Sequence, residues 1–291
     1  MFKGTHTALV TPFKNGQLDE EAFSALIEGQ ISAGITGIVP VGTTGESPTL
    51  SHEEHLSVVE QAVRQAKGRC LVMAGTGSNS TSEAISLTCE AEQRGANAAL
   101  IVAPYYNRPT QEGLFQHFQA IAAQTRLPIM LYSIPGRCGV EIAVETVARL
   151  AKACPNVVSI KEAGGNVDRV SQLRAALPDS FEILSGDDGL TLPFIATGAV
   201  GVVSVASNLI PAEIVNLVNL ALSDDFASAR AQHERLYQLF KDLFIESNPA
   251  PIKAALALQG RLAADVRPPL VNASEPTVAK LRQTLSQLGL L

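Results

Sequence analysis

Lys161 ends a short apolar run, residues 157–160, and is followed at once by Glu162-Ala163-Gly164-Gly165. A lysine at the dry end of a buried strand is the side chain in this sequence best suited to imine (Schiff-base) chemistry. In low dielectric the charged amine is disfavoured, so its pKa falls and a neutral nucleophile becomes available. A lysine at a strand end more often extends to water. The interpretation therefore depends on what the fold places around Lys161.

Hydroxyls, phenols and this one amine follow the predicted strands at the end where barrel enzymes carry out their chemistry. They are Thr43, Thr44, Tyr105, Tyr106, Tyr132, Lys161 and Ser204. Such a set suits imine formation, in which protons pass to and from a carbinolamine. It suits metal-assisted hydrolysis poorly, because histidine and carboxylate ligands are scarce there. We expect neither a metal nor a cofactor. Cys138 is a weaker alternative nucleophile, since no histidine lies near it in the sequence.

Short apolar runs alternate with amphipathic segments along most of the chain. The predicted strands cover residues 7–10, 37–41, 70–74, 98–103, 128–132, 157–161, 181–184 and 200–205. The predicted helices between them cover residues 20–33, 53–67, 82–94, 112–125, 144–153, 167–177, 189–197 and 212–222. Eight such units predict parallel strands with crossover helices, and eight is the number that closes a barrel.

No further strand is expected after the eighth unit. Helical patterns cover residues 227–244, 251–258 and 276–288. We therefore predict an α/β fold, a (β/α)8 TIM barrel, as a catalytic domain over residues 1–223. A small C-terminal helical domain over residues 224–291 is expected to follow it.

Two helix starts carry recognisable signals. Ser51 and Ser80 are each followed three residues later by a glutamate, which is the spacing of a capping box. His52 and His55 lie three residues apart at the first of these starts and could share a face that binds a metal. The absence of a third nearby ligand makes that the weaker interpretation.

The composition excludes several classes of function. The chain has 291 residues, of which 46% are hydrophobic and 17% charged, so it can bury a sizeable core. Its formal charge is −6 with no cluster of lysine or arginine, which argues against a nucleic-acid partner. Polar residues interrupt the most apolar stretch, residues 198–222, so no membrane span is expected. Without a secretory signal or paired cysteines, the chain is expected to be cytoplasmic.

Two features could bind carboxylates. Glycines flank Thr43 and Thr44, so the backbone can approach a small ligand closely, and the loop leads toward a helix start. Arg137, in a proline- and glycine-bearing turn, offers a planar fork for a second carboxylate.

Several ordered motifs resemble the dihydrodipicolinate synthase family of the pyruvate-dependent Schiff-base aldolases, over essentially the whole chain. They are Ala8-Leu9-Val10-Thr11-Pro12-Phe13, Gly42-Thr43-Thr44-Gly45-Glu46, Ala74-Gly75-Thr76-Gly77, Pro104-Tyr105-Tyr106-Asn107-Arg108-Pro109, residues 132–137, Ile160-Lys161-Glu162-Ala163, residues 184–188 and Asn248-Pro249-Ala250-Pro251-Ile252-Lys253. Departures are modest, for example Ser133 where asparagine is usual. They concern the aldehyde pocket rather than the lysine chemistry.

The resemblance implies roles for individual residues. Lys161 would condense with pyruvate, and the resulting enamine would attack L-aspartate 4-semialdehyde in the diaminopimelate route to lysine. Tyr132 would shuttle protons, linked through Thr43 to Tyr106 of a neighbouring subunit, which implies a tight dimer, usually paired into a tetramer. Thr44, Arg137, Val203 and Gly186 would bind the substrates.

Two alternatives stay open. Related lyases act on N-acetylneuraminate or on 2-keto-3-deoxy sugar acids. Sialic acid lyases typically have Ser-Thr in place of Thr43-Thr44 and lack the arginine at position 137, so both features favour the synthase. A non-catalytic barrel that senses pyruvate or an amino acid is disfavoured because Lys161 and Tyr132 are both present.

The resemblance also implies feedback inhibition by L-lysine at a dimer interface. The matching residues are Ser47, His52, His55, Asn79, Glu83 and Tyr105. Glu83 could carry the charge that faces the ligand's ammonium group. Pro48 departs from the small residue often found in the family, and a capping role for Glu83 would compete with ligand binding.

Overall fold

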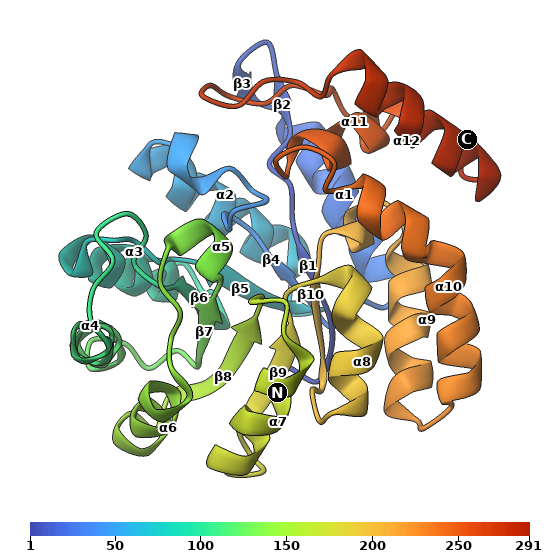
Figure 1. Cartoon of the computed structure of the whole chain (residues 1–291). Helices are drawn as coiled ribbons and strands as arrows, with labels where there is room; N and C mark the ends of the chain where they lie inside the picture. Colours follow the sequence, from blue (N-terminus) through green and yellow to red (C-terminus); the bar gives the residue numbers. More distant parts are fainter.

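Eight parallel strands close into a barrel in the computed structural model, which describes residues 1–291 (Figure 1). The barrel strands are β1 (Gly4–Ala8), β4 (Gly37–Val39), β5 (Leu71–Gly75), β6 (Ala98–Val102), β7 (Ile129–Ser133), β8 (Val157–Glu162), β9 (Glu182–Ser185) and β10 (Gly201–Ser204). Neighbours in the chain are neighbours in the barrel, and β1 pairs with both β10 and β4 to close it. The predicted TIM barrel is confirmed.

Helices follow the strands and surround the barrel (Figure 1). They are α1 (Glu20–Ser32), α2 (His52–Ala66), α3 (Thr81–Gln93), α4 (Gln111–Ala122), α6 (Val144–Ala153), α7 (Val167–Ala176), α8 (Thr191–Ala196) and α9 (Pro211–Leu222). The strands are buried on both faces, so they consist mostly of apolar residues with little alternation. Polar side chains within them therefore need a reason to be there.

The first strand begins earlier than predicted, at Gly4 instead of residue 7. The missed start includes the buried His6, whose Nε2 pairs with the Phe2 carbonyl at 2.9 Å while its Nδ1 has no partner. Thr7, within the predicted range, donates from Oγ1 to Gln30 Oε1 at 2.6 Å. A glycine and two polar residues occupy positions 4–6, so the apolar pattern did not mark the start of this strand. The second strand ends early, because Val41 leaves the extended region with a φ of 50°.

Several short elements were not expected. A two-stranded hairpin, β2 (Phe13–Lys14) with β3 (Gln17–Leu18), follows β1. The turn that carries Arg137 is a short helix, α5 (Pro135–Cys138), and Pro135 occupies its first position. Three 3₁₀ turns, η1 (Ser47–Thr49), η2 (Asp188–Leu190) and η3 (Ala206–Asn208), follow barrel strands.

The two predicted capping boxes differ. At α2 both hydrogen bonds form: Glu54 N donates to Ser51 Oγ at 3.1 Å and Ser51 N donates to a Glu54 carboxylate oxygen at 2.9 Å. At α3 Ser80 caps the helix, but the Glu83 carboxylate turns away. It accepts from Ser78 Oγ and lies 2.7 Å from His52 Nε2. The predicted capping box at α3 is therefore wrong for Glu83, because its side chain does not accept from the Ser80 backbone N–H.

Three further helices complete the chain: α10 (Phe226–Asp242), α11 (Ala250–Leu258) and α12 (Glu275–Gln287). Helix α10 packs on α9 and α12, and α11 packs on α12. Figure 1 shows α11 and α12 at the same end of the molecule as the β2–β3 hairpin. No helix is both long and apolar enough to cross a membrane.

Candidate active site

Lys161 lies near the carboxyl end of β8, and its residue is only 6% exposed. The strand register places it directly beside Tyr132 of β7. Its Nζ lies 4.1 Å from the centroid of the Tyr132 ring. Burial lowers the pKa of Lys161 to about 7; the charge of Asp188 opposes this shift and that of Arg137 adds to it. A large fraction of the amine is therefore neutral and nucleophilic near pH 7.

Gly186, which follows β9, makes room for this lysine. A Cβ atom at this position would lie 2.6 Å from Ala163 Cβ and 3.0 Å from Lys161 Cε. Any larger residue would therefore displace the lysine side chain. This contact supplies a physical reason for the glycine that the family resemblance alone did not give.

Asp188 is a buried carboxylate that the sequence reasoning did not select. Its oxygens accept from Ser204 Oγ and from the backbone N–H groups of Val205 and Ala206, the latter two at 3.0 and 2.9 Å. Burial raises the pKa of Asp188 to about 6, and the Ser204 hydrogen bond opposes that rise. The carboxylate is the negative group whose field favours the protonated form of Lys161. It can also stabilise an iminium cation formed there.

Tyr132 is 5% exposed, and burial raises the pKa of its phenol to about 12. The charge of Arg137 and the approaching Thr43 hydroxyl both oppose that rise. The phenol therefore stays protonated at neutral pH. A protonated phenol beside a neutral amine can donate a proton to a departing hydroxyl group.

The loop that carries Thr43 and Thr44 is bracketed by two strained residues. Val41 and Glu46 have φ values of 50° and 56°, a region in which non-glycine residues cost roughly 1–3 kcal/mol each. Gly45 fits only as glycine, because a Cβ would lie 2.9 Å from Val41 N. The loop is thus held in one shape by its surroundings.

Thr44 and Arg137 share a neighbour that the sequence reasoning did not choose as a site residue. Asn248 Nδ2 donates to Thr44 Oγ1 at 2.9 Å, and the Asn248 carbonyl accepts from Arg137 Nη2 at 3.4 Å. The Asn248 Oδ1 atom is buried without a hydrogen-bond partner. The only sequence signal for Asn248 was its place in the family motif at residues 248–253. The contacts make it the link between the two predicted carboxylate-binding residues.

A cavity of about 230 Å³ opens at this end of the barrel. Its lining includes Thr43, Tyr132 and Arg137 together with Ser47 and Tyr105. Cys138 also lines it, but burial raises the pKa of this thiol to about 11. The thiol is therefore a poor nucleophile at neutral pH, which leaves Lys161 as the better one.

Five of the predicted catalytic and substrate-binding residues do not line this cavity: Lys161, Thr44, Gly186, Val203 and Tyr106. Val203 is fully buried on β10. Tyr106 is 90% exposed with a φ of 72°, so its phenol is not enclosed by its own chain. Nothing in a single chain gives Tyr106 a partner in the site.

Of the residues of the predicted lysine site, His52 contacts the Glu83 carboxylate, and Ser47 and Tyr105 line the cavity. Hydrogen bonding from Ser78, and then from His52, lowers the pKa of Glu83, so it is charged at neutral pH. Asn79 Nδ2 donates to the Tyr105 carbonyl at 3.2 Å. Burial lowers the pKa of His55 to about 4, which keeps its imidazole neutral.

Comparisons with known proteins agree with this geometry. A family model described as the dihydrodipicolinate synthetase family matches residues 1–288. A 4-hydroxy-tetrahydrodipicolinate synthase from Syntrophus aciditrophicus is 51% identical over 291 residues, covering 100% of both chains. The solved structure of 4-hydroxy-tetrahydrodipicolinate synthase from Methylacidiphilum fumariolicum SolV is 57% identical with a TM-score of 0.98, covering 99% of this chain and 96% of that one. The Cyanidioschyzon merolae enzyme, solved with lysine bound, is 41% identical with a TM-score of 0.97, covering 100% and 99%.

Proposed function

The chain belongs to the dihydrodipicolinate synthetase family, and we propose that its Lys161 forms an imine with pyruvate in the first step of its reaction. It is a 4-hydroxy-tetrahydrodipicolinate synthase, a lyase that condenses pyruvate with L-aspartate 4-semialdehyde in the diaminopimelate route to lysine. The observation that carries the proposed role of Lys161 is a buried amine with a pKa of about 7, beside a protonated phenol. The relatives' shared name favours this reaction over the sialic acid and sugar-acid lyases.

The chemistry follows from the protonation states. Neutral Lys161 attacks the keto carbon of pyruvate, and the carbinolamine loses its hydroxyl as water when Tyr132 supplies a proton. Loss of a methyl proton from the imine gives an enamine, whose carbon attacks the aldehyde. The amine of the adduct then attacks the imine carbon and displaces Lys161 as the ring closes. Thr43, beside the phenol, relays protons to and from Tyr132.

Four residues would hold the substrates. Thr44 would bind the pyruvate carboxylate and Arg137 the carboxylate of the aldehyde substrate. Asn248 supports the pairing, because it contacts both residues at once. Gly186 gives the adduct space beside Lys161, and Val203 forms an apolar wall.

Borohydride trapping tests the lysine role. Reduction in the presence of pyruvate should add one reduced pyruvyl group, which peptide mass spectrometry locates on Lys161. The Lys161→Ala variant should gain no mass under the same conditions. An unchanged wild-type mass, or label on another residue, would remove Lys161 from the reaction. Turnover with aspartate semialdehyde but not with N-acetylneuraminate checks the substrate.

A second copy of the chain would complete the site. Tyr106 is exposed, as expected of a residue that is buried only when another subunit covers it. Mixing inactive Tyr106→Phe chains with inactive Lys161→Ala chains should recover activity, because one site of each mixed dimer then holds both residues. If activity does not recover under conditions in which subunits exchange, Tyr106 does not complete the site of a neighbouring subunit. The tetramer and the cytoplasmic location stay predictions.

L-Lysine would regulate the enzyme through Glu83 and its neighbours. The carboxylate is free of the cap that would compete for it, and it faces His52. A relative has been solved with lysine bound. Millimolar L-lysine should inhibit the wild type, and Glu83→Gln should weaken inhibition without changing uninhibited turnover. Insensitive wild-type enzyme would rule this site out.

The division of the chain is likewise a proposal. Residues 1–223 would form the catalytic barrel domain and residues 224–291 the helical domain. Asn248 and Lys253, from the second part, reach residues near the barrel mouth. The two parts would therefore act together in one site.

A further inference from the structure

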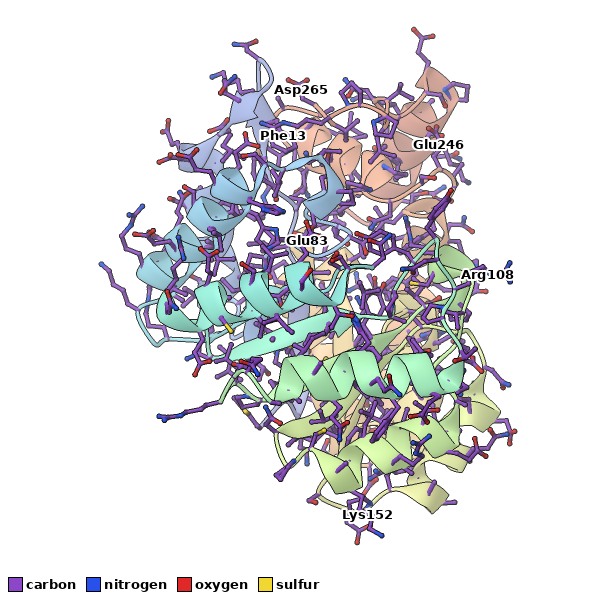
Figure 2. All side chains as sticks on the ribbon, turned by 90° about the vertical axis from the view of Figure 1, so that its left-hand side faces the viewer. Phe13, Glu83, Arg108, Lys152, Glu246 and Asp265 are labelled. Carbon is purple, nitrogen blue, oxygen red and sulfur yellow. The ribbon has the colours of Figure 1, made fainter.

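A second lysine is buried even more completely than Lys161. Lys253, on α11, has no exposed surface. Its Nζ is paired with the Glu46 carboxylate, donates to the Asp265 carbonyl at 2.8 Å and lies 4.2 Å from the centroid of the Phe13 ring. Figure 2 places Phe13 and Asp265 close together at one end of the molecule. This lysine joins three segments that are distant in the sequence.

The Glu46 carboxylate is held on both of its oxygens. One accepts from Lys253, and the other accepts from the Arg267 backbone N–H at 2.9 Å. The Arg267 guanidinium in turn pairs with Glu54 at 2.6 Å and lies 4.3 Å from the centroid of the Phe13 ring. Glu46 therefore cannot rotate away without breaking a buried ion pair. We call the Glu46–Lys253 ion pair the clamp.

The clamp acts on the loop that carries the catalytic threonine. Glu46 lies two residues after Thr44, and its backbone N–H donates to the Thr43 carbonyl at 3.1 Å. It has the left-handed φ of 56° that a non-glycine residue adopts only when its surroundings impose it. Its residue is 1% exposed and both carboxylate oxygens are occupied by Lys253 and Arg267, so it does not act by touching substrate.

We propose that Glu46 and Lys253 are positioning residues that hold Thr43 and Thr44 in their substrate-facing orientation. This inference builds on the proposed function, because the readout is the capture of pyruvate. A buried ion pair is often no more stabilising than apolar residues of the same shape, although losing one partner is costly. Because Glu46 belongs to the loop that carries Thr43 and Thr44, the clamp can fix the conformation of that loop as well as contribute to stability. A displacement of Thr44 weakens binding of the pyruvate carboxylate.

The test compares two destabilised variants. Glu46→Gln keeps the size of the side chain but leaves Lys253 without its counter-charge, and should raise the KM for pyruvate roughly tenfold while kcat falls less. Borohydride trapping at low pyruvate should slow by the same factor. Thr284→Val is the matched control, because Thr284 is buried and donates to Asp242 at 2.5 Å between α12 and α10. It should lower Tm and leave the KM unchanged.

The neutral double variant Glu46→Gln/Lys253→Met separates an effect on the conformation of the loop from an effect on stability. It can be used even if Glu46→Gln alone does not fold. It should recover most of the Tm, because no buried charge is left unpaired, yet keep the raised KM. A KM that returns to the wild-type value with Tm, or rises equally in Thr284→Val, would overturn the inference. Wild-type protein that pyruvate and borohydride fail to label would instead overturn the proposed function.

Discussion

Two buried lysines, in neighbouring regions of the same molecule, have opposite proposed roles. Lys161, at the barrel mouth, and Lys253, on the C-terminal helix α11, are 6% and 0% exposed. Each Nζ lies against an aromatic ring, 4.1 Å from the centroid of Tyr132 and 4.2 Å from that of Phe13. Burial lowers the pKa of both amines. Neither burial nor the aromatic contact distinguishes a catalytic lysine from a structural one.

The difference lies in the carboxylate. Glu46 contacts Lys253 directly and counteracts the effect of burial on its pKa, so that amine is committed to an ion pair. Asp188 influences Lys161, but its own oxygens accept from Ser204 and two backbone N–H groups. Lys161 is therefore left free to react. In this molecule the two amines differ in that Lys253 forms a direct ion pair, whereas no carboxylate contacts Lys161 directly.

Removing the reactive amine should have the largest effect. Lys161→Ala deletes the nucleophile, which positioning alone cannot replace, so kcat should fall by at least roughly 10⁴-fold. Lys253→Ala should reduce turnover far less per folded molecule. Steady-state rates, normalised to the folded fraction from circular dichroism, check both. Similar losses in the two variants would erase the distinction between the lysines.

Replacing each lysine by methionine should change stability in opposite directions. Lys253→Met leaves the Glu46 charge buried without its partner, which should cost about 3–5 kcal/mol of unfolding free energy. Lys161→Met removes an amine whose pKa falls from 10.5 to about 7 on folding, and should stabilise the fold by roughly 1–3 kcal/mol at pH 7.

The pH dependence of the unfolding free energy is the control for the comparison of the two methionine variants. Between pH 7 and 10.5 the unfolded wild-type chain binds more protons at Lys161 than the folded chain, so this residue makes stability rise with pH. The Lys161→Met variant should lack that contribution. Urea unfolding at pH 7 and pH 9 measures it. Destabilisation of both methionine variants at pH 7 would show that Lys161 is also held by a favourable ion pair.

Removing the proposed proton shuttle, Tyr132, should have the next largest effect on turnover. Tyr132→Phe removes the phenol while keeping the ring against Lys161, so kcat should fall roughly 10²–10³-fold. Because the ring stays in place, Tm should change little. Tyr237→Phe, on the exposed face of α10, is the matched control and should change neither quantity. Near-normal turnover of Tyr132→Phe would assign the proton transfer to another group.

Most of the fold could be predicted because the barrel strands and their helices repeat one apolar pattern. Some errors occurred where polar residues are buried in the core, as at His6 near the start of β1. Others occurred where the backbone leaves the extended region, as at Val41. Neither a tertiary hydrogen bond nor a positive φ at a β-branched residue has a signature in local sequence pattern.

The proposed nucleophile could be selected from the sequence for a different reason. Lys161 stands out because an ionisable residue interrupts an apolar strand. Asp188 and Asn248 do not stand out, because they lie in polar loops where such residues are common. Their importance comes from contacts with Ser204 and Thr44, which only the fold creates. Glu46 was part of a recognised motif, but its partner Lys253 lies 207 residues away.

The smallest expected effect concerns the charge that faces Lys161. Imine formation needs the neutral amine, so kcat/KM for pyruvate should fall about tenfold per pH unit below pH 7. Asp188 raises the pKa of Lys161, so Asp188→Asn should extend activity to lower pH by roughly one unit. The kcat/KM values of the wild type and of Asp188→Asn should converge below about pH 6, where Asp188 itself takes up a proton.

Asp187→Asn is the matched control for that profile. The Asp187 side chain accepts from Gly189 N at 2.7 Å; its charge raises the pKa of Asp188 but is not among those that shift the pKa of Lys161. Asp187→Asn should leave the acid limb of the kcat/KM profile at the same pH as in the wild type. If Asp188→Asn moves the limb to higher pH instead, the carboxylate does not act as the counter-charge of Lys161. The contrast with Lys253 would then depend on burial geometry alone, since neither the aromatic contact nor the charge would separate the two amines.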